Sequence, residues 1–262
     1  MRQKRRSLDY VDLRRPTIFA HRGSSAYAPE NTLAAFELAV EQRAEGIELD
    51  VKLSADEQVV VMHDDTVDRT TNGSGRVKSL TLPELKQLDA GSKFHPTFAA
   101  QQIPTLDEVF EAVGDKLIIN VELTNYSSPT DNLPDKVIFL VKKYSLEASI
   151  ILSSFNIISL IKARNLLPRI PLGFLTQRGE AQATLQTQII RFGPLLALHP
   201  AHSDITPQLI QTIHKVKSPI RPYTVNQPDV MLQLLSAGVD GFFTDDPVLA
   251  QNILASQKPR NP

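Results

Sequence analysis

The chain has 262 residues, of which 42% are hydrophobic and 22% are charged. These fractions are typical of a globular protein with a buried core and exclude a disordered chain. Because there is no cysteine, disulfides, thiolate metal ligands and a cysteine nucleophile are excluded. The net charge of −1 also argues against nucleic acid as a partner, since a surface that binds phosphate backbones is normally basic.

Residues 1–15 form a basic N-terminal extension with six Arg or Lys and two Asp, and we expect it to be flexible. The longest run without a charged residue, 148–161, is short of the roughly 20 apolar residues that cross a bilayer. The basic start is not followed by the apolar core of a secretory signal. We therefore expect no stable membrane insertion and a cytoplasmic location, and we leave the oligomeric state open.

Short apolar runs alternate with stretches of helical spacing along the chain. Nine strands are predicted, at residues 17–20, 47–53, 59–62, 117–123, 150–152, 172–175, 195–198, 220–225 and 241–244. Helices are predicted over 32–43 and 106–113, and from Pro134, Pro207 and Pro228, because proline is favoured in a first helical turn. No linker interrupts this alternation, which predicts a single domain over residues 16–262.

The second and third strands are joined only by residues 54–58, too few for a parallel crossover. We therefore predict that they form an antiparallel hairpin. Without the extra strand, eight strand–helix units remain, which is the count of a closed α/β barrel of the TIM (β/α)8 type. Residues from about 64 to 104 lose the alternation and are predicted to be a small insertion over one end of the barrel.

Carboxylates cluster at the predicted strand ends, where barrel enzymes place their sites. Glu48 and Asp50 are two residues apart in one strand, so both point to the same face. Glu122 ends a later strand and could add a third acid. A single acid is more often a structural ion pair, but three together suit a hard divalent cation such as Mg²⁺ or Ca²⁺.

Two histidines stand beside these acids. His21 follows the first strand and is followed by Arg22 and a glycine, which outlines a phosphate site. His63 follows the hairpin, and pairing residue 53 with residue 58 predicts that it lies opposite Glu48. His199 is interpreted equally as a pocket residue or as part of the core, and the acids at 245–246 as a helix cap.

A set of motifs resembles the signature of the glycerophosphodiester phosphodiesterases. The motifs span roughly residues 16–253 and are His21-Arg22-Gly23, Pro29-Glu30-Asn31-Thr32, Glu48-Leu49-Asp50, His63-Asp64, Asp89-Ala90-Gly91, Pro104-Thr105-Leu106, Val121-Glu122, Ser153-Ser154-Phe155-Asn156, Thr224-Val225-Asn226, Asp240-Gly241 and Thr244-Asp245-Asp246-Pro247. The resemblance implies a TIM barrel with a small insertion after the second catalytic His. It also implies hydrolysis of glycerophosphodiesters, such as glycerophosphocholine or glycerophosphoethanolamine, to sn-glycerol 3-phosphate and an alcohol.

By this resemblance, His21 and His63 are the acid/base pair. Glu48, Asp50 and Glu122 bind one divalent metal ion, Mg²⁺ or Ca²⁺. The resemblance also points to a glycerol hydroxyl of the substrate as the nucleophile, which gives a cyclic phosphate that water then opens.

The substrate-binding residues implied by the resemblance are Arg22, Thr124 and Tyr223. Arg22 would hold the phosphate. Thr124 stands where the family often has a Lys, so one positive charge is missing, and charge-assisted bonds to phosphate are stronger than neutral ones. Tyr223 stands where the family usually has Trp, which changes the pocket wall mildly.

Two other functions are kept as alternatives. One is a lysophospholipase D-type phosphodiesterase acting on larger lipids, for which the sequence offers no amphipathic anchor helix. The other is a catalytically weak glycerophosphodiester-binding protein, which the change at Thr124 would favour. Substrate specificity for the alcohol and the choice of metal are left open.

Overall fold

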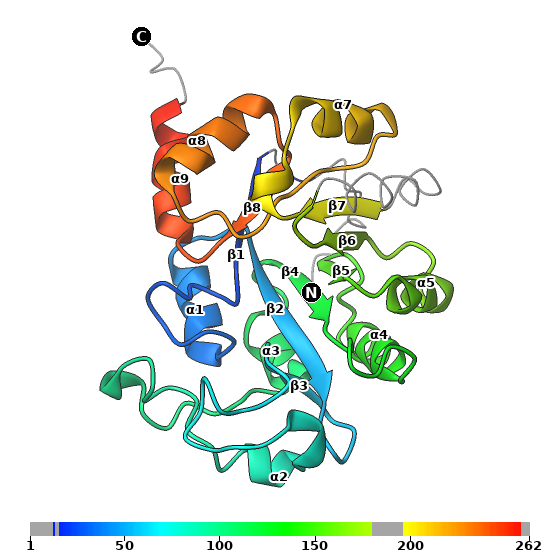
Figure 1. Ribbon diagram of the computed structural model, residues 1–262. Coiled ribbons are helices and arrows are strands. Elements are labelled where there is room, and N and C mark those ends of the chain that lie inside the picture. The colour runs from blue at the N-terminus through cyan, green and yellow to red at the C-terminus, as the bar shows by residue number, and fades with distance from the viewer. Residues whose placement is uncertain (1–12, 14–15, 180–195, 258–262) are drawn as a thin grey trace, which may run out of the picture.

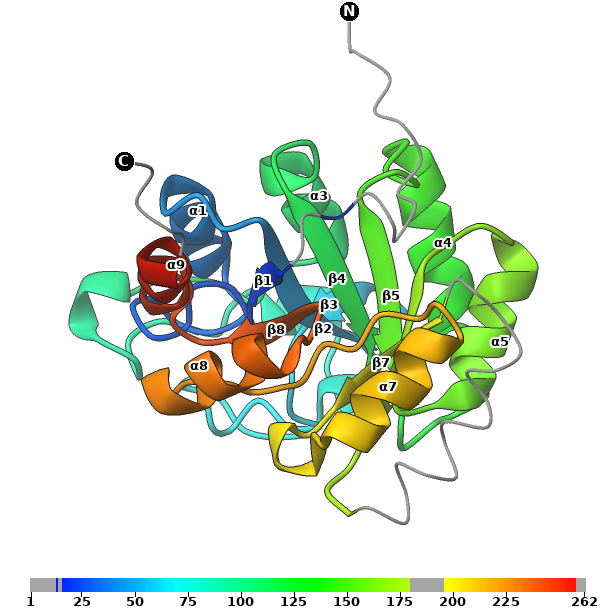
Figure 2. The ribbon, with the colours of Figure 1, turned by 90° about the horizontal axis from the view of Figure 1, so that it is seen from above.

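The strands form one mostly parallel sheet that curves into a barrel with the helices outside it (Figure 1, Figure 2). The computed structural model describes residues 13, 16–179 and 196–257, so the expected extension 1–15 lies outside the described residues except for Leu13. The strand order is β7-β6-β5-β4-β2-β1-β8, and β3 pairs with β2. The strands are β1 (Thr17–Ala20), β2 (Gly46–Leu53), β3 (Val59–Val61), β4 (Ile118–Leu123), β5 (Ile150–Ser154), β6 (Leu172–Thr176), β7 (Leu196–Pro200) and β8 (Gly241–Thr244). The α/β barrel predicted from the sequence is confirmed.

The helices begin where the sequence carries caps or prolines. Thr32 accepts a hydrogen bond from the first turn of α1, and Thr105 forms a capping box with Glu108 at α3. Pro207 and Pro228 are the first residues of α7 and α8. The α-helices are α1 (Leu33–Glu41), α2 (Leu82–Leu85), α3 (Leu106–Val113), α4 (Leu133–Lys143), α5 (Ile157–Leu166), α7 (Pro207–Lys215), α8 (Pro228–Ala237) and α9 (Pro247–Gln257). None of the helices in the described ranges is long and apolar enough to span a membrane.

Side chains alternate between the two faces of β2 as the strand period requires. Ile47, Leu49 and Val51 point outward into the main apolar core, where they pack with the surrounding helices. Glu48 and Asp50 are equally buried but line a cleft inside the barrel. The same strand therefore supplies both core and site.

The barrel is closed between β7 and β8 by a segment that the sequence predicts as a strand, residues 220–225. It is not a regular strand: only isolated parallel bridges, at Ile220 and Tyr223, join it to β7. Backbone hydrogen bonds nevertheless run to both neighbours, from Tyr223 N to Pro200 O and from Val225 N to Phe243 O. The segment contains Pro222 and follows Pro219, and because proline has no N–H to donate, a continuous ladder cannot form.

The predicted antiparallel hairpin of β2 and β3 is present, but its register differs from the one expected. Residue 53 pairs with residue 59, not with residue 58. The loop holds three residues, because Ser54 N donates to Gln58 O and Glu57 takes a left-handed φ of 59°. His63 consequently lies beyond the end of β3 and is not in register with Glu48.

The segment between β3 and α3 carries the short helices η2 (Val77–Ser79), α2 and η3 (Pro96–Phe98). Figure 1 shows it on one side of the barrel, next to β3. It has an apolar cluster of its own, formed by Val60, Met62, Val67, Val77, Leu85, Ala90 and Ile103. This cluster anchors the segment to the hairpin and so fixes the position of His63.

Candidate active site

A cleft of ≈ 170 Å³ opens at the carboxyl ends of β1, β2 and β4. We call it the carboxylate cleft. It is lined by His21, Arg22, Glu48, Asp50, His63, Asn120, Glu122, Phe155, Leu175, Tyr223, Thr224 and Phe243. Seven of the eight residues that the sequence singled out therefore meet in one place, and the exception is Thr124.

Three carboxylates form the floor of this cleft. Asp50 and Glu122 are directly paired in the parallel register of β2 and β4, and Glu48 precedes Asp50 on the same face. One oxygen from each of the three lies within 4.8 Å of the others. Burial and the charge of Asp50 raise the pKa of Glu122 to about 8, and burial with both neighbouring charges raises the pKa of Glu48 well above its usual range.

The three acids are oriented by neighbouring groups. Asn31 Nδ2 donates to Asp50 at 2.9 Å, and Tyr126 Oη donates to Glu122 at 2.6 Å. Glu48 accepts from the backbone N–H of Arg22 at 3.0 Å through one oxygen. Its other oxygen is buried without a hydrogen-bond partner among the described residues. Oriented, mutually repelling carboxylate oxygens fit a hard divalent cation, which would supply the missing partner.

His21 is held by an aspartate at the end of the last strand. Its Nδ1 lies 2.7 Å from Asp245 Oδ1, and its Nε2 lies 4.0 Å from Glu48. Burial alone would raise the pKa of Asp245, but the hydrogen bond and charge of His21 lower it overall. An ionised carboxylate can only accept, so Nδ1 carries the proton and Nε2 faces the cleft as the basic nitrogen.

His63 is held in the same way by the next residue. Its Nδ1 lies 2.6 Å from Asp64, which also accepts from Arg69 Nε at 2.6 Å. Burial opposes ionisation of Asp64, but the hydrogen bonds from Arg69 and His63 outweigh it and bring its pKa down to about 2. Arg69 in turn donates twice to Glu30, at 2.8 and 2.7 Å.

Arg22 joins this second network to the carboxylates. Its Nη1 donates to Glu30 at 2.8 Å and its Nε lies 3.5 Å from Asp50. Arg22 and Gly23 both have a positive φ, 56° and 80°, which turns the chain sharply after β1. A side chain at Gly23 would also meet the backbone of Ala35 in α1 at 2.7 Å, so this turn requires glycine.

The two other expected substrate contacts lie in different places. Tyr223 is in the wall of the carboxylate cleft, where its ring packs edge-on against Phe155 and its hydroxyl donates to Thr176 O at 2.8 Å. Thr124 lies in a neighbouring cleft. Its hydroxyl donates to Val51 O at 2.8 Å and accepts from Lys52 Nζ at 2.9 Å, so its only proton is already in use.

Several site residues were not expected from the sequence. Asp245 was interpreted as a helix cap, yet only its neighbour Asp246 caps α9, through Leu249 N. Glu30 and Arg69 are 39 residues apart, and no local pattern predicts their contact. Its place directly after the last strand, at the same barrel end as His21, marks Asp245 as a candidate, but Asp before Pro also suits a helix cap and that interpretation was preferred.

His199 belongs to the barrel interior and does not line the carboxylate cleft. It is buried against Phe243, with ring centroids 4.9 Å apart. Gly173 makes room for it, because a Cβ there would lie 2.3 Å from its Cε1. Burial and the charge of Arg221 lower the pKa of His199 well below its usual value, so the ring is neutral near pH 7.

Comparison with known proteins identifies the family of this chain. The model of the glycerophosphoryl diester phosphodiesterase family matches residues 21–249. A glycerophosphodiester phosphodiesterase of Caldanaerobacter subterraneus is 42% identical over 238 residues, covering 90% of this chain and 97% of the relative. One of Bacillus altitudinis is 38% identical over 245 residues, covering 92% and 99%.

Solved structures lead to the same class. An Oleispira antarctica phosphodiesterase in complex with the product sn-glycerol-3-phosphate superimposes with a TM-score of 0.85 and 32% identity, covering 92% of this chain and 97% of that one. A glycerophosphodiester phosphodiesterase of Thermotoga maritima gives a TM-score of 0.72 at 27% identity, covering 90% and 97%. The barrel and its cleft therefore define a phosphoric diester hydrolase. The chain belongs to the glycerophosphoryl diester phosphodiesterase family, which confirms the resemblance seen in its motifs.

Proposed function

We propose that this enzyme hydrolyses small glycerophosphodiesters to sn-glycerol 3-phosphate and an alcohol, with a divalent metal ion and two histidines. The observation that carries the proposal is the pairing of His21 with Asp245 and of His63 with Asp64, at 2.7 and 2.6 Å, on the rim of one carboxylate cleft. Two histidines whose free nitrogens are set by carboxylates are suited to act as base and acid in one reaction.

The two histidines differ in exposure, which supports a division of roles. The side chain of His21 is 17% exposed and lies beside Glu48, whereas that of His63 is 41% exposed. His21 Nε2 accepts the proton of the attacking hydroxyl, either of water or of the glycerol moiety. Attack by the glycerol hydroxyl gives a cyclic phosphate, which water then opens to sn-glycerol 3-phosphate. His63 donates a proton to the oxygen of the leaving alcohol as its bond to phosphorus breaks, on the side from which the alcohol can reach solvent.

Glu48, Asp50 and Glu122 hold the metal ion in this proposal, and hard oxygen ligands favour Mg²⁺ or Ca²⁺. The bound ion supplies Lewis-acid stabilisation of charge on the phosphoryl oxygens and a fixed point for the glycerol hydroxyls. Arg22 is the phosphate ligand, because its guanidinium lies in the cleft and is turned there by Glu30 and Asp50.

Small, water-soluble diesters suit the cleft better than lysophospholipids. Its volume of ≈ 170 Å³ is below that of ordinary pockets for drug-sized ligands. The Oleispira phosphodiesterase at 32% identity holds sn-glycerol-3-phosphate, a product of matching size. The apolar part of the wall, Phe155, Leu175 and Phe243, lies in the same cleft and suits the short carbon skeleton of a small alcohol.

The test is release of glycerol 3-phosphate from glycerophosphocholine, first in EDTA and then with Mg²⁺, Ca²⁺ or Mn²⁺ restored. We expect no release with the chelator and full activity with one of the ions. Greater activity on lysophosphatidylcholine than on glycerophosphocholine would favour the lysophospholipase D-type alternative. Tight binding of the diester without product, with any ion, would favour a binding protein.

A further inference from the structure

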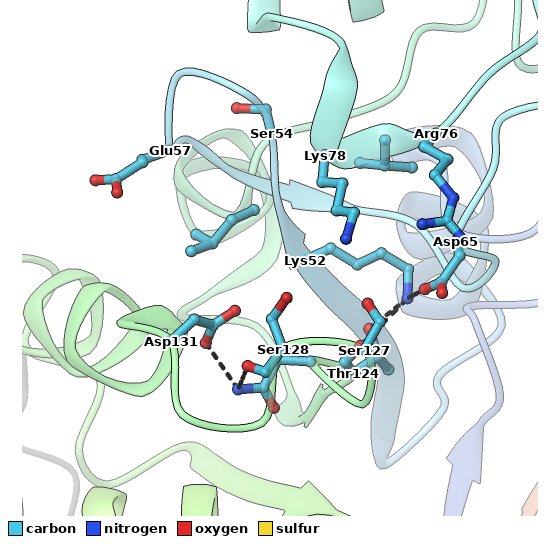
Figure 3. A pocket seen from close by; sticks show the side chains of 13 residues that line it. Lys52, Ser54, Glu57, Asp65, Arg76, Lys78, Thr124, Ser127, Ser128 and Asp131 are labelled. Carbon is cyan, nitrogen blue, oxygen red and sulfur yellow. Dashed lines mark hydrogen bonds and ion pairs between the residues drawn. The ribbon is translucent and has the colours of Figure 1, made fainter.

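A second cleft, of ≈ 200 Å³, lies next to the carboxylate cleft (Figure 3). We call it the lysine cleft. One wall comes from the end of β2 and the η2 segment, and the facing wall from the loop between β4 and α4. Figure 3 shows Lys52, Arg76 and Lys78 on one side and Ser128 and Asp131 on the other.

Lys52 is the innermost cation of the lysine cleft. It is only 8% exposed, and its ammonium donates to Thr124 Oγ1 at 2.9 Å and lies 3.4 Å from Asp65. A buried ammonium is retained only where it is compensated. Here the exposed carboxylate of Asp65 and the hydroxyl and carbonyl oxygens of Thr124 provide the compensation, so Lys52 contributes fixed positive charge to the inner wall of the cleft.

Arg76 and Lys78 add two more positive charges from the η2 segment. Both side chains are exposed and turn toward Lys52 (Figure 3). Within the described ranges, no ion pair involves either of them, whereas Lys52 has Asp65. The lysine cleft therefore contains two exposed cations that have no ion-pair partner among the described residues.

The remaining carboxylates of the lysine cleft are engaged elsewhere. Glu57 lies 3.3 Å from Lys136 and accepts from Asn132. Asp131 accepts from Asn125 Nδ2 at 2.7 Å and from the backbone N–H of Leu133 at 3.1 Å. Glu57 thus has a cationic partner outside the lining, and the oxygens of Asp131 accept from neutral donors, so neither acid is paired with Arg76 or Lys78.

The lysine cleft is in line with the carboxylate cleft along two strands. Lys52 lies two residues after Asp50 on β2. Thr124 lies two residues after Glu122 and directly follows the end of β4. Residues two apart on one face of a strand are separated by roughly 7 Å. A ligand with its diester phosphate at the carboxylates could therefore extend a second group into the lysine cleft.

We propose that the lysine cleft binds a second phosphoryl group on the alcohol part of the substrate. Arg and Lys are the side chains that bind phosphate oxygens best, and Ser127 and Ser128 add hydroxyl donors from the facing loop. The enzyme then favours glycerophosphodiesters whose leaving alcohol is itself phosphorylated over those with a neutral alcohol. This inference rests on the proposed hydrolysis of glycerophosphodiesters.

Two substrates that differ only in the distal group test it. One is glycerophosphoglycerol, whose leaving alcohol is neutral, and the other is 1,3-bis(glycerophospho)glycerol, whose leaving alcohol carries a second phosphodiester. Release of glycerol 3-phosphate is measured for both with the full chain and a divalent ion. The cleft variant combines Arg76→Gln and Lys78→Gln. The control variant removes the same charge through Lys116→Gln and Lys215→Gln. Both control residues are exposed, and neither lines the two clefts.

We expect the wild type to prefer the doubly charged substrate through a lower KM. In the cleft variant, the ratio of the two kcat/KM values should fall roughly tenfold, because two charge-assisted hydrogen bonds are lost. The control variant should keep the ratio of the wild type. An unchanged ratio in the cleft variant would overturn the proposal.

Failure of the underlying reaction gives a different result, namely no release from either substrate with any ion. In that case, isothermal titration calorimetry measures the binding of 1,3-bis(glycerophospho)glycerol and of inorganic phosphate to both variants, and this tests whether the lysine cleft binds anions. Weaker binding to the cleft variant than to the control would support the lysine cleft as an anion site. Equal binding to both would contradict it.

Discussion

His21 and Asp245 meet because they directly follow two paired residues on neighbouring strands. Ala20 on β1 is in register with Thr244 on β8, and the next residue of each strand turns into the carboxylate cleft with Nδ1 2.7 Å from Oδ1. Asn226 fixes Asp245 from the other side, donating to Oδ2 at 2.6 Å. The pairing of β1 with β8 therefore sets the orientation of His21.

Replacing Asp245 tests this orientation. In Asp245→Asn the amide no longer holds the proton on Nδ1, so the basic nitrogen is not reliably turned to the cleft. We expect kcat to fall about 100-fold, within the usual contribution of a positioned acid or base. The control is Asp246→Asn, which keeps a side-chain oxygen to cap α9 and should leave both thermal stability and kcat close to those of the wild type. Equal kcat losses in both variants would contradict the assignment.

The two histidines can be removed one at a time. We predict that His21→Ala and His63→Ala each abolish measurable hydrolysis of glycerophosphocholine, while circular dichroism and the unfolding midpoint stay close to those of the wild type. His202→Ala serves as the matched control, because His202 begins the short helix η4 (His202–Asp204) and does not line the carboxylate cleft. Near-normal turnover in one variant would remove that histidine from the mechanism.

The carboxylate cluster predicts a pH-dependent response to metal. With the pKa of Glu122 at about 8 against an ordinary value of 4.5, the folded chain binds its proton more tightly than the unfolded chain. Stability of the metal-free protein should therefore decline as pH rises from about 4.5 to about 8. A divalent ion displaces the proton, so Mg²⁺ or Ca²⁺ should raise Tm more at pH 8 than at pH 5.

Differential scanning calorimetry in EDTA and in each ion checks this response. In Glu122→Gln we expect a flatter dependence of Tm on pH and a much smaller gain from metal. A gain of the same size at both pH values in the wild type would argue against the raised pKa. No gain at any pH would argue against the metal site.

The environment of Thr124 predicts the effect of restoring the lysine common in the family. Thr124 is 2% exposed and accepts a hydrogen bond from Lys52 at 2.9 Å. A second ammonium at this position would be buried beside the first. We expect Thr124→Lys to lower the free energy of unfolding by about 3 kcal/mol or more, as for other uncompensated buried charges, measured by urea unfolding.

The matched control is the exchange Lys52→Thr with Thr124→Lys, which keeps one cation at this contact and moves it from β2 to β4. It should recover most of the lost stability. If the single variant is as stable as the wild type, the ammonium of Lys52 does not occupy the space that a lysine at 124 requires.

The features that could be predicted from the sequence are those that depend on the geometry of neighbouring residues. The period of a strand places Glu48 and Asp50 on one face whatever the rest of the chain does. The hairpin was predictable from its short connection, but its register was not. Register depends on whether the loop holds four residues or three, and the left-handed Glu57 that closes a three-residue loop has no sequence signal of its own.

Long-range pairings account for the rest of what was missed. An Asp before Pro is typical of a helix cap, and Asp246 is one. The same stretch of sequence contains Asp245, which orients His21, and the local pattern does not distinguish the two roles. Thr124 was expected to bind the substrate, and its contacts with Lys52 and Val51 show that its hydroxyl proton is already used. Such choices depend on which residues meet across the barrel.

The segment that closes the barrel also has a consequence for motion. Pro219 and Pro222 contribute no amide proton to the bonds with the neighbouring strands, and the segment carries Tyr223 and Thr224 of the cleft wall. Local opening is easiest where backbone bonds are sparse. We therefore expect amide exchange in residues 219–225 to be faster than in the regular strands described above, and a bound substrate to slow it.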